Sequence, residues 1–257
     1  MREDIFDLGC HGYTHKSADE MSKEEYSLEI ADAIDFLRIN FPNQKVLTFA
    51  APYNVTNLTY LAYLDDYAIS CRVGGNGTQA YLGKQNDMYD VKAFGFSENS
   101  NFENIQNQTD YLVNDGAWVV YFFHTVTEGE PYEAVGTSKE TLDAHCKVLY
   151  DKYNGRVWFA SFEEVSIYEK QLQNVKMNPT DMSGDSMIFT VNSTLDTDIY
   201  NIPMTFKVYV PSTAQTAYAK VNGEPQDIET VQTDENGSYI YVYNVPIDNS
   251  SIEIILI

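Results

Sequence analysis

The sequence predicts an α/β domain with a parallel sheet, followed by a small antiparallel β-sandwich. Strand-like and helix-like patterns alternate from Met1 to about Gln173, and the strand-like runs are apolar without polar alternation. Strands of this kind are buried on both faces, as in a parallel sheet covered by helices. Beyond about residue 187, only short β-type runs occur. We therefore predict a first domain over residues 1–175 and a second over residues 176–257.

In the first domain, a capping box formed by Ser22 and Glu25 precedes apolar residues at helical spacing, which predicts a helix over 23–39. The elements expected after it are a strand over 45–52, a short helix over 58–66, a strand over 67–75, a helix over 101–115, a strand over 117–124, a helix from a second capping box at Thr137 and Glu140 to about Tyr153, a strand over 156–161 and a helix over 162–173.

The second domain begins after "MNPTDMSGDS" (177–186), a stretch rich in Pro, Gly, Ser and Asp that is typical of a linker. Six short β-type runs then follow, with turn residues between them and no helical period. Strands at this spacing favour an antiparallel sandwich. The six runs cover residues 187–192, 204–211, 216–222, 227–233, 238–245 and 251–257.

Charge and composition exclude several classes of partner. The 257 residues carry a net charge of −22 with a pI of about 4.3, so nucleic acid and anionic membrane surfaces would repel the chain. The sequence has no apolar run of roughly 18 residues or more, the length that a membrane-spanning helix needs. Its first ten residues lack the apolar core of a signal peptide. Three scattered cysteines form neither a disulfide framework nor a CxxC metal motif.

Residues that suit chemistry follow several of the predicted strands. His11 and His15, four residues apart, can face one metal ion, although two exposed loop histidines would give the same pattern. Pro52 and Tyr53 stand at the carboxyl end of a strand, where sites form in parallel α/β folds. A proline that simply ends the strand is the alternative.

Two further candidates also stand at strand ends. His124 ends the most apolar strand and suits acid–base catalysis, or it is a core histidine bonded to a backbone carbonyl. Arg72 is a cation in a very acidic chain, and a structural ion pair would account for it equally. The succession of these residues at strand ends, in chain order, is more specific than any one of them.

Several stretches together resemble the polysaccharide deacetylases, the family that includes chitin and peptidoglycan deacetylases and acetylxylan esterases. These stretches are "DLGCHGYTH", "LTFAAPYN", "WVVYFFHTV" and "VWFASFEEVSIYEK". The segment "LDTDIYNIPMTFKVYVP" also resembles the β-domain that follows the catalytic domain in one bacterial branch. The resemblance implies a distorted, incomplete (β/α) barrel with a metal ion at the carboxyl ends of the strands. It further implies an extracellular or cell-surface location.

The resemblance also implies a role for each candidate. His11 and His15 would be two of the three protein ligands of a zinc-type ion, with cobalt or nickel as alternatives. The backbone N–H of Tyr53, after Pro52, would stabilise the oxyanion, and His124 would be the general acid. Phe122 would line the pocket for the acetyl methyl group. The implied reaction removes acetyl groups from an acetylated polysaccharide, first of all one of the N-acetylglucosamine type.

The sequence departs from the family at two points. The Asp-Asp strand that carries the base and the third metal ligand is absent, and Asp4 and Asp7 stand in a segment that matches a different part of the family. Ala50 replaces the arginine that holds the base, and Arg72 could supply that guanidinium. Two hypotheses follow: the chain is an N-terminally incomplete deacetylase, or it is a non-catalytic carbohydrate-binding protein.

Overall fold

A computed structural model describes residues 6–55, 61–74, 87–96, 102–130, 135–182 and 186–256. The chain divides into two compact units, Met1–Ser166 and Ile167–Ile257, which we call the N-terminal and the C-terminal unit. The division falls inside helix α5 (Phe162–Asn174), so the two halves of this helix belong to different units. Our sequence boundary at residue 175 stands at the end of that helix.

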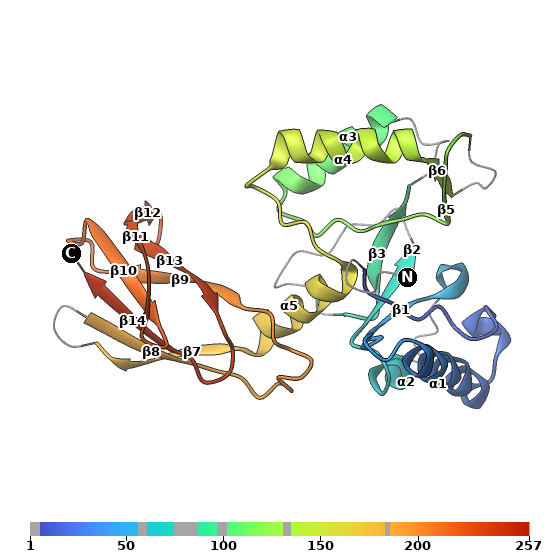
Figure 1. Ribbon diagram of the computed structural model, residues 1–257, viewed down its shortest axis with the longest axis horizontal. Helices are drawn as coiled ribbons and strands as arrows, with labels where there is room; N and C mark the ends of the chain where they lie inside the picture. Colours follow the sequence, from blue (N-terminus) through green and yellow to red (C-terminus); the bar gives the residue numbers. More distant parts are fainter. Residues whose placement is uncertain are drawn as a thin grey trace. The chain divides into compact units, whose positions relative to one another are not determined.

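The N-terminal unit is built on a parallel sheet with the strand order β1-β2-β3-β4 (Figure 1). Every neighbouring pair in it is parallel, and Cys10 adds an isolated parallel bridge to Phe49. The predicted α/β class with a parallel sheet is therefore confirmed for this unit. Its strands are β1 (Thr48–Ala50), β2 (Ser70–Gly74), β3 (Val91–Gly95) and β4 (Tyr121–Phe122).

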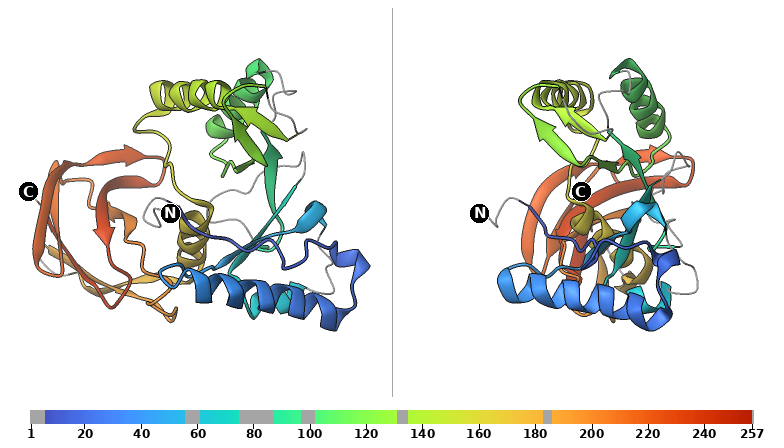
Figure 2. Two further views of the ribbon diagram at one scale, coloured as in Figure 1. Left: turned by 45° about the vertical axis from the view of Figure 1, so that its right-hand side comes forward. Right: turned by 90° about the vertical axis from the view of Figure 1, so that its right-hand side faces the viewer.

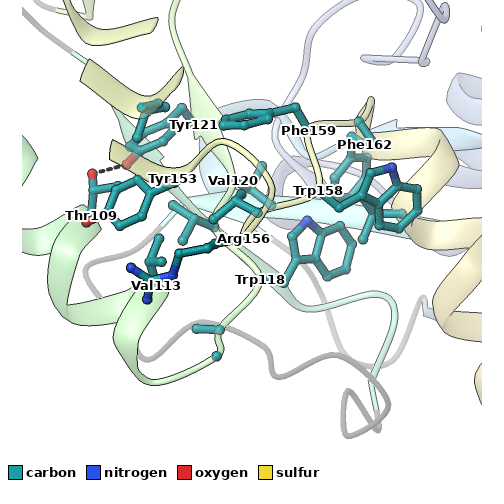
Figure 3. Close-up of a pocket in the computed structure, with 17 residues that line it drawn as sticks. Thr109, Val113, Trp118, Val120, Tyr121, Tyr153, Arg156, Trp158, Phe159 and Phe162 are labelled. Atoms are coloured by element: carbon teal, nitrogen blue, oxygen red, sulfur yellow. Dashed lines mark hydrogen bonds between the residues drawn. The ribbon is translucent and has the colours of Figure 1, made fainter. Parts of the chain in front are cut away.

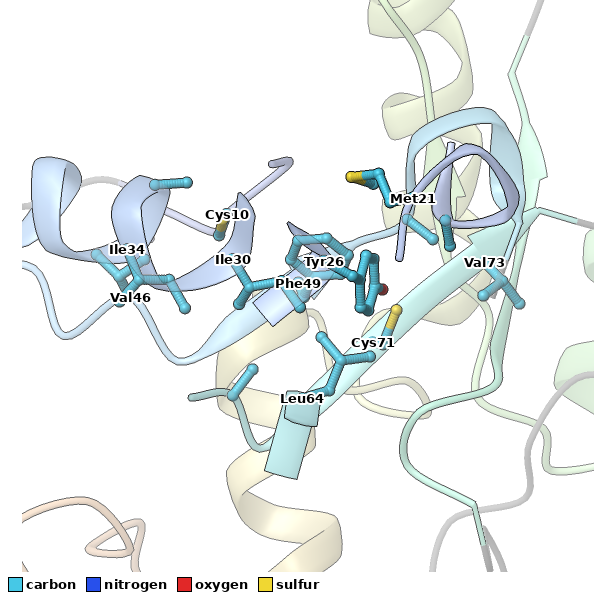
Figure 4. Close-up of a cluster of buried hydrophobic side chains, with 14 residues drawn as sticks. Cys10, Met21, Tyr26, Ile30, Ile34, Val46, Phe49, Leu64, Cys71 and Val73 are labelled. Carbon is cyan, nitrogen blue, oxygen red and sulfur yellow. The ribbon is translucent and has the colours of Figure 1, made fainter. Parts of the chain in front are cut away.

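Helices α1 (Lys23–Asn40) and α2 (Leu61–Asp65) cover β1 and β2 and close the main core of this unit. Figure 4 shows Tyr26 and Ile30 of α1 pointing at Phe49 and Cys71 from the two strands. All four side chains are almost fully buried. The predicted capping box is present at the start of α1, since the Ser22 side chain and the Glu25 side chain each accept the other's backbone N–H.

A second pair of helices, α3 (Phe102–Asn114) and α4 (Lys139–Tyr153), lies side by side in both views of Figure 2. Asp110 of α3 accepts hydrogen bonds from Lys152 and Tyr153 of α4, and these bonds tie the two helices together. A short parallel pair, β5 (Thr125–Thr127) and β6 (Gly136–Ser138), leads into α4.

Some of the sequence predictions for this unit are wrong in detail. The N-cap of α4 is Ser138, whose side chain accepts the N–H of Thr141, whereas Thr137 pairs with Val126 in β6. Of the strand expected over 117–124, only Tyr121–Phe122 forms a strand, and Ala117 adds an isolated bridge. Residues 156–161, all within the described part of the chain, form no strand. A strand exists only with a pairing partner, and an apolar run alone does not provide one.

The C-terminal unit is the predicted antiparallel sandwich. Five strands form one sheet in the order β11-β10-β14-β8-β7, and three form the other in the order β12-β13-β9. Buried side chains from both sheets share one core. The strands are β7 (Lys176–Asp181), β8 (Ser186–Asn192), β9 (Met204–Val210), β10 (Thr216–Val221), β11 (Glu224–Thr230), β12 (Gln232–Asp234), β13 (Gly237–Val245) and β14 (Ser251–Leu256).

Two predictions for this unit need correction. The expected linker begins as strand β7, which pairs antiparallel with β8. Its Pro179 is tolerated because β7 lies at the edge of the sheet, where a missing backbone donor costs least. The single strand expected over 227–233 is two strands, β11 and β12, which belong to different sheets. Among the described helices of the chain, none is long and apolar enough to cross a bilayer.

Candidate functional site

The segment that carries His11 and His15 is a loop held against helix α1. Its Thr14 donates to the carboxylate of Glu29 from both its backbone N–H and its hydroxyl, the latter at 3.0 Å. Gly12 has a φ of +82°, and a Cβ there would lie 2.9 Å from Glu29 Oε1. A glycine is therefore required at this point of the loop, both for the backbone conformation and for space.

The two imidazoles of this loop lie together. Their ring centroids are 4.8 Å apart in an edge-on arrangement, and His11 Nδ1 lies 2.7 Å from the carbonyl oxygen of Ala50. With Nδ1–H donating to that carbonyl, Nε2 carries the free lone pair. A hydrogen bond of this kind orients the histidines that ligate metal ions in proteins.

The environment of His11 also favours its neutral form. Burial lowers its pKa, the carbonyl of Ala50 opposes this, and the positive charges of His15, Arg72 and His124 lower the pKa further. Only a neutral imidazole can bind a metal ion, so this pKa suits a ligand at neutral pH. These effects also show that His15, Arg72 and His124 lie close enough to His11 to act on it electrostatically.

The donor set for a metal ion is nevertheless incomplete. A catalytic zinc ion usually takes three protein ligands and a water. Within the described ranges, no group of three or more His, Cys, Asp and Glu side chains could hold a metal ion. Cys10 is buried in the core, and burial raises the pKa of its thiol to about 11, which keeps it protonated. Among the described residues, His11 and His15 could therefore offer two ligands, and no third one accompanies them.

The turn after β1 places Tyr53 beside the histidines. Pro52–Asn54 forms a 3₁₀ turn in which Tyr53 and Asn54 have φ values of +54° and +61°. The N–H groups of Asn54 and Val55 donate hydrogen bonds within this turn. The N–H of Tyr53 stands at the start of the turn, where no carbonyl of the turn can accept from it. The centroid of the Tyr53 ring lies 4.9 Å from that of His15, and Tyr53 as a residue is 65% exposed.

Arg72 was expected at a strand end, but it lies in the middle of β2, and two contacts hold its side chain there. Its guanidinium lies 4.4 Å from the centre of the Phe122 ring and donates to Asn54 Oδ1 at 3.0 Å. Asn54 in turn rests on Gly74, where a Cβ would come within 2.2 Å of the Asn54 side chain. The absence of a side chain at position 74 therefore allows Asn54 to reach Arg72.

These residues border a pocket of about 260 Å³, which we call the polar pocket. His11, Arg72 and Phe122 are among its lining residues. His15, Tyr53 and His124 are not lining residues. His15 adjoins the pocket through a ring contact with His11, and the Tyr53 ring contacts that of His15 in turn. The His124 ring lies 6.4 Å from that of Phe122.

The polar pocket also contains carboxylates that the sequence did not single out. Asp7 lines it and accepts a hydrogen bond from the hydroxyl of Ser161, 154 residues away. Glu163 lines it too and accepts the N–H of Leu47 at 3.2 Å. Burial raises the pKa of Glu163, and the charge of Asp7 contributes to this. No short-range motif marks Asp7 or Glu163, because their partners come from distant parts of the chain.

A larger apolar pocket of about 480 Å³ adjoins the polar one, and Val120, Tyr121 and Phe162 line both. Figure 3 shows its aromatic walls, where the rings of Trp118 and Phe162 stack with centroids 5.4 Å apart. Trp158 also lines it and is 47% exposed. Exposed aromatic faces beside a polar pocket suit a ligand that has both apolar faces and polar edges.

Comparison with known proteins gives two similarities. A scan against models of known protein families finds no match. The chain is 25% identical over 141 residues to a gellan lyase from Bacillus sp., a stretch that covers 54% of this chain but only 6% of that protein. The structure of the present chain is similar to a crystal structure of a protein from Mycobacterium smegmatis, which bears the provisional name polysaccharide deacetylase. In that comparison the TM-score is 0.44 and the identity 12%, over 63% of this chain and 62% of the other.

Proposed function

We propose that this chain is a metal-dependent hydrolase that removes acetyl groups from an acetylated polysaccharide at the cell surface or outside the cell. Among acetylated glycans, we propose one of the N-acetylglucosamine type as the first candidate substrate. The observation that carries the proposal is the pair of imidazoles, His11 and His15, beside a pocket lined by Arg72 and Phe122. In this proposal, the N-terminal unit is a distorted, incomplete (β/α) barrel of the polysaccharide deacetylase type.

The proposed chemistry starts from the difficulty of the reaction, since an amide or ester carbonyl is a weak electrophile. His11 and His15 would hold a divalent ion, with zinc first and cobalt or nickel as alternatives. When bound, such an ion supplies Lewis acidity to the carbonyl and to a water molecule. The N–H of Tyr53, in the turn begun by Pro52, would donate to the oxyanion.

The remaining roles concern protons and binding. His124 would protonate the departing amine or hydroxyl, a task that suits an imidazole near neutral pH. Phe122 would pack on the acetyl methyl group. Asp7 would take the proton of the attacking water, and Ser161, which donates to it, would keep its carboxylate oriented. Arg72, which lines the same pocket, would supply the guanidinium that holds the base.

A second candidate function is carbohydrate binding without hydrolysis. One observation favours it: the described residues hold only two of the three protein ligands that a catalytic zinc ion takes. The aromatic walls of the apolar pocket would serve glycan binding equally well in either case.

Acetate release separates the two functions. The chain is incubated with hexa-N-acetylchitohexaose, or with acetylated xylan, in the presence of zinc, cobalt or nickel. We expect release of acetate that falls by roughly 100-fold or more in His124→Ala, the usual effect of losing a general acid. Asp7→Asn should fall likewise, whereas the matched control Asp35→Asn, on the exposed side of α1, should not change the rate. Binding of the glycan with no acetate release under any of the three metals would overturn the hydrolase proposal in favour of the binding one.

A further inference from the structure

The three-stranded sheet of the C-terminal unit carries a row of tyrosines on its outer face. Tyr239, Tyr241 and Tyr243 occupy alternate positions of β13, so they share one face, while Ile240 and Val242 between them are buried in the core. The neighbouring strand β9 extends the row, since its residue 209 is also a tyrosine and pairs directly with residue 239. We call Tyr209, Tyr239, Tyr241 and Tyr243 the tyrosine face.

The rings of the tyrosine face form a continuous chain of contacts. From Tyr209 to Tyr239 to Tyr241 to Tyr243, successive ring centroids are 6.1, 5.5 and 6.1 Å apart. The row does not close over itself, because Tyr209 and Tyr243 at its two ends remain 42% and 41% exposed. The four rings therefore form a row of aromatic surface in contact with water. Leaving aromatic surface exposed to water costs free energy that burial in a core would avoid.

Polar groups hold these rings in place. The Lys207 ammonium lies 3.9 Å from the centre of the Tyr239 ring and bonds to Asp234 of β12. The Tyr209 hydroxyl donates to the same carboxylate at 3.2 Å, and the Tyr239 hydroxyl donates to Gln232 Oε1 at 3.1 Å. The hydrogen bonds fix the ring orientations before any ligand arrives, which lowers the entropic cost of binding.

Charge narrows the range of ligands. The lysine and the aspartate on the face compensate each other, and the C-terminal unit as a whole holds 12 acidic and 4 basic side chains, a net charge of −8. Such a surface repels nucleic acids and other polyanions. A ligand that fits it is uncharged, long, apolar on one face and rich in hydroxyl groups at its edges.

We propose that the tyrosine face binds an uncharged polysaccharide chain. The C–H faces of successive sugar rings stack on the tyrosines, and sugar hydroxyls bond to the phenol groups, Asp234 and Gln232. This binding is independent of acetyl hydrolysis, because every residue that it uses lies in the C-terminal unit. Cross-strand aromatic pairs also stabilise sheets by themselves, so the experiment has to measure ligand binding as well as stability.

Affinity electrophoresis of the full chain in gels that contain hydroxyethyl cellulose or neutral xylan tests this proposal, with hexa-N-acetylchitohexaose in calorimetry as the soluble probe. Truncation of one stacking ring should weaken binding by roughly fivefold to tenfold, which corresponds to about 1–1.4 kcal/mol for an aromatic contact. We expect Tyr239→Ala/Tyr241→Ala to migrate freely. Tyr241→Phe, which keeps the ring, should still be retarded.

A matched control comes from the other sheet. Ile228 of β11 is 66% exposed, and Ile228→Ala should leave the retardation unchanged. Should the double variant fail to fold by circular dichroism, the single variants Tyr209→Ala and Tyr243→Ala at the two exposed ends replace it. Undiminished retardation in folded variants, or no binding of the wild-type chain to any of the neutral glycans, would overturn the proposal, as would light scattering that shows the face to be a dimer contact. Retardation without acetate release would leave this inference standing and count only against the hydrolase.

Discussion

The buried histidine on helix α4, His145, is the residue through which we expect pH to affect stability. His145 is 2% exposed, and its Nδ1 lies 2.6 Å from the side-chain nitrogen of Gln106. The rings of Phe96 and Tyr121 pack against it with centroids about 5 Å away. Its Nε2 has no hydrogen-bond partner among the described residues. Burial lowers the pKa of this imidazole, so the folded chain holds it neutral.

A lowered pKa in the folded state makes the unfolded chain the better proton acceptor. The free energy of unfolding should therefore fall as the pH drops below about 6.5, where the unfolded histidine begins to bind a proton and the folded one does not. Urea denaturation at about pH 7.5 and 5.5 measures this loss. We expect His145→Gln, which removes the titrating group, to lose less stability between the two pH values than the wild type. An equal loss in both chains would contradict the assignment.

Glu29 is a second buried residue of interest, because it bonds to the loop that carries His11 and His15. It is buried and accepts two hydrogen bonds from Thr14 in the histidine loop. Glu29→Ala should lower the free energy of unfolding by about 1–3 kcal/mol, because the bonds to a charged acceptor are lost. Chemical denaturation measures this, and Glu24→Ala on the exposed side of the same helix is the control. An equal effect of the two substitutions would refute the role of Glu29 in holding the loop.

At the scale of elements, the contact between β2 and the turn after β1 leaves no room for a side chain at position 74. Gly74 leaves room for Asn54, which bonds to Arg72. Gly74→Ala should cost about 1–3 kcal/mol of stability through overpacking. Gly95→Ala in β3 is the matched control, since a Cβ there meets its nearest atom at 3.4 Å. Thermal unfolding compares the two, and a smaller loss for Gly74→Ala than for Gly95→Ala would be the contrary result.

Elements with a strong local signal were predictable from the sequence, and those fixed by distant partners were not. The capping box and the apolar period of α1 are local, and they are confirmed. The apolar run over 156–161 looked like a strand, yet the structure gives it no strand pairing. Strand β3 (Val91–Gly95) was not predicted, because its five residues include a lysine and are too few to establish an apolar pattern.

The same distinction applies to the candidate site. His11, Arg72 and Phe122 share the polar pocket. The spacing of His11 to His15 and the place of Arg72 near the end of an apolar run are local signals, whereas Phe122 was expected only from the resemblance to the polysaccharide deacetylases. The role of Asp7 could not be predicted from the sequence, because the hydrogen bond that orients its carboxylate comes from Ser161, which is 154 residues away along the chain. Glu29 was likewise hidden, because a helical glutamate normally faces solvent.

At the scale of the whole molecule, the two units share helix α5, and this has a consequence for dissecting the chain. Gln171 in the second half of α5 is fully buried and bonds to both the N–H and the carbonyl of Ile202, at 3.1 and 2.7 Å. A C-terminal fragment that begins at residue 162 should therefore unfold at a higher temperature than one that begins at residue 176. Circular dichroism of the two fragments measures the difference, and identical melting curves would show that α5 does not belong to this unit.

The central claim concerns the whole chain as a metal-dependent hydrolase, and zinc titration by calorimetry tests it most directly. The account predicts that the wild-type chain binds about one zinc ion. His11→Gln and His15→Gln should each abolish that binding, while Asp35→Asn should retain it. Binding of the same amount of zinc by both histidine variants, or no zinc binding by the wild-type chain, would contradict the claim.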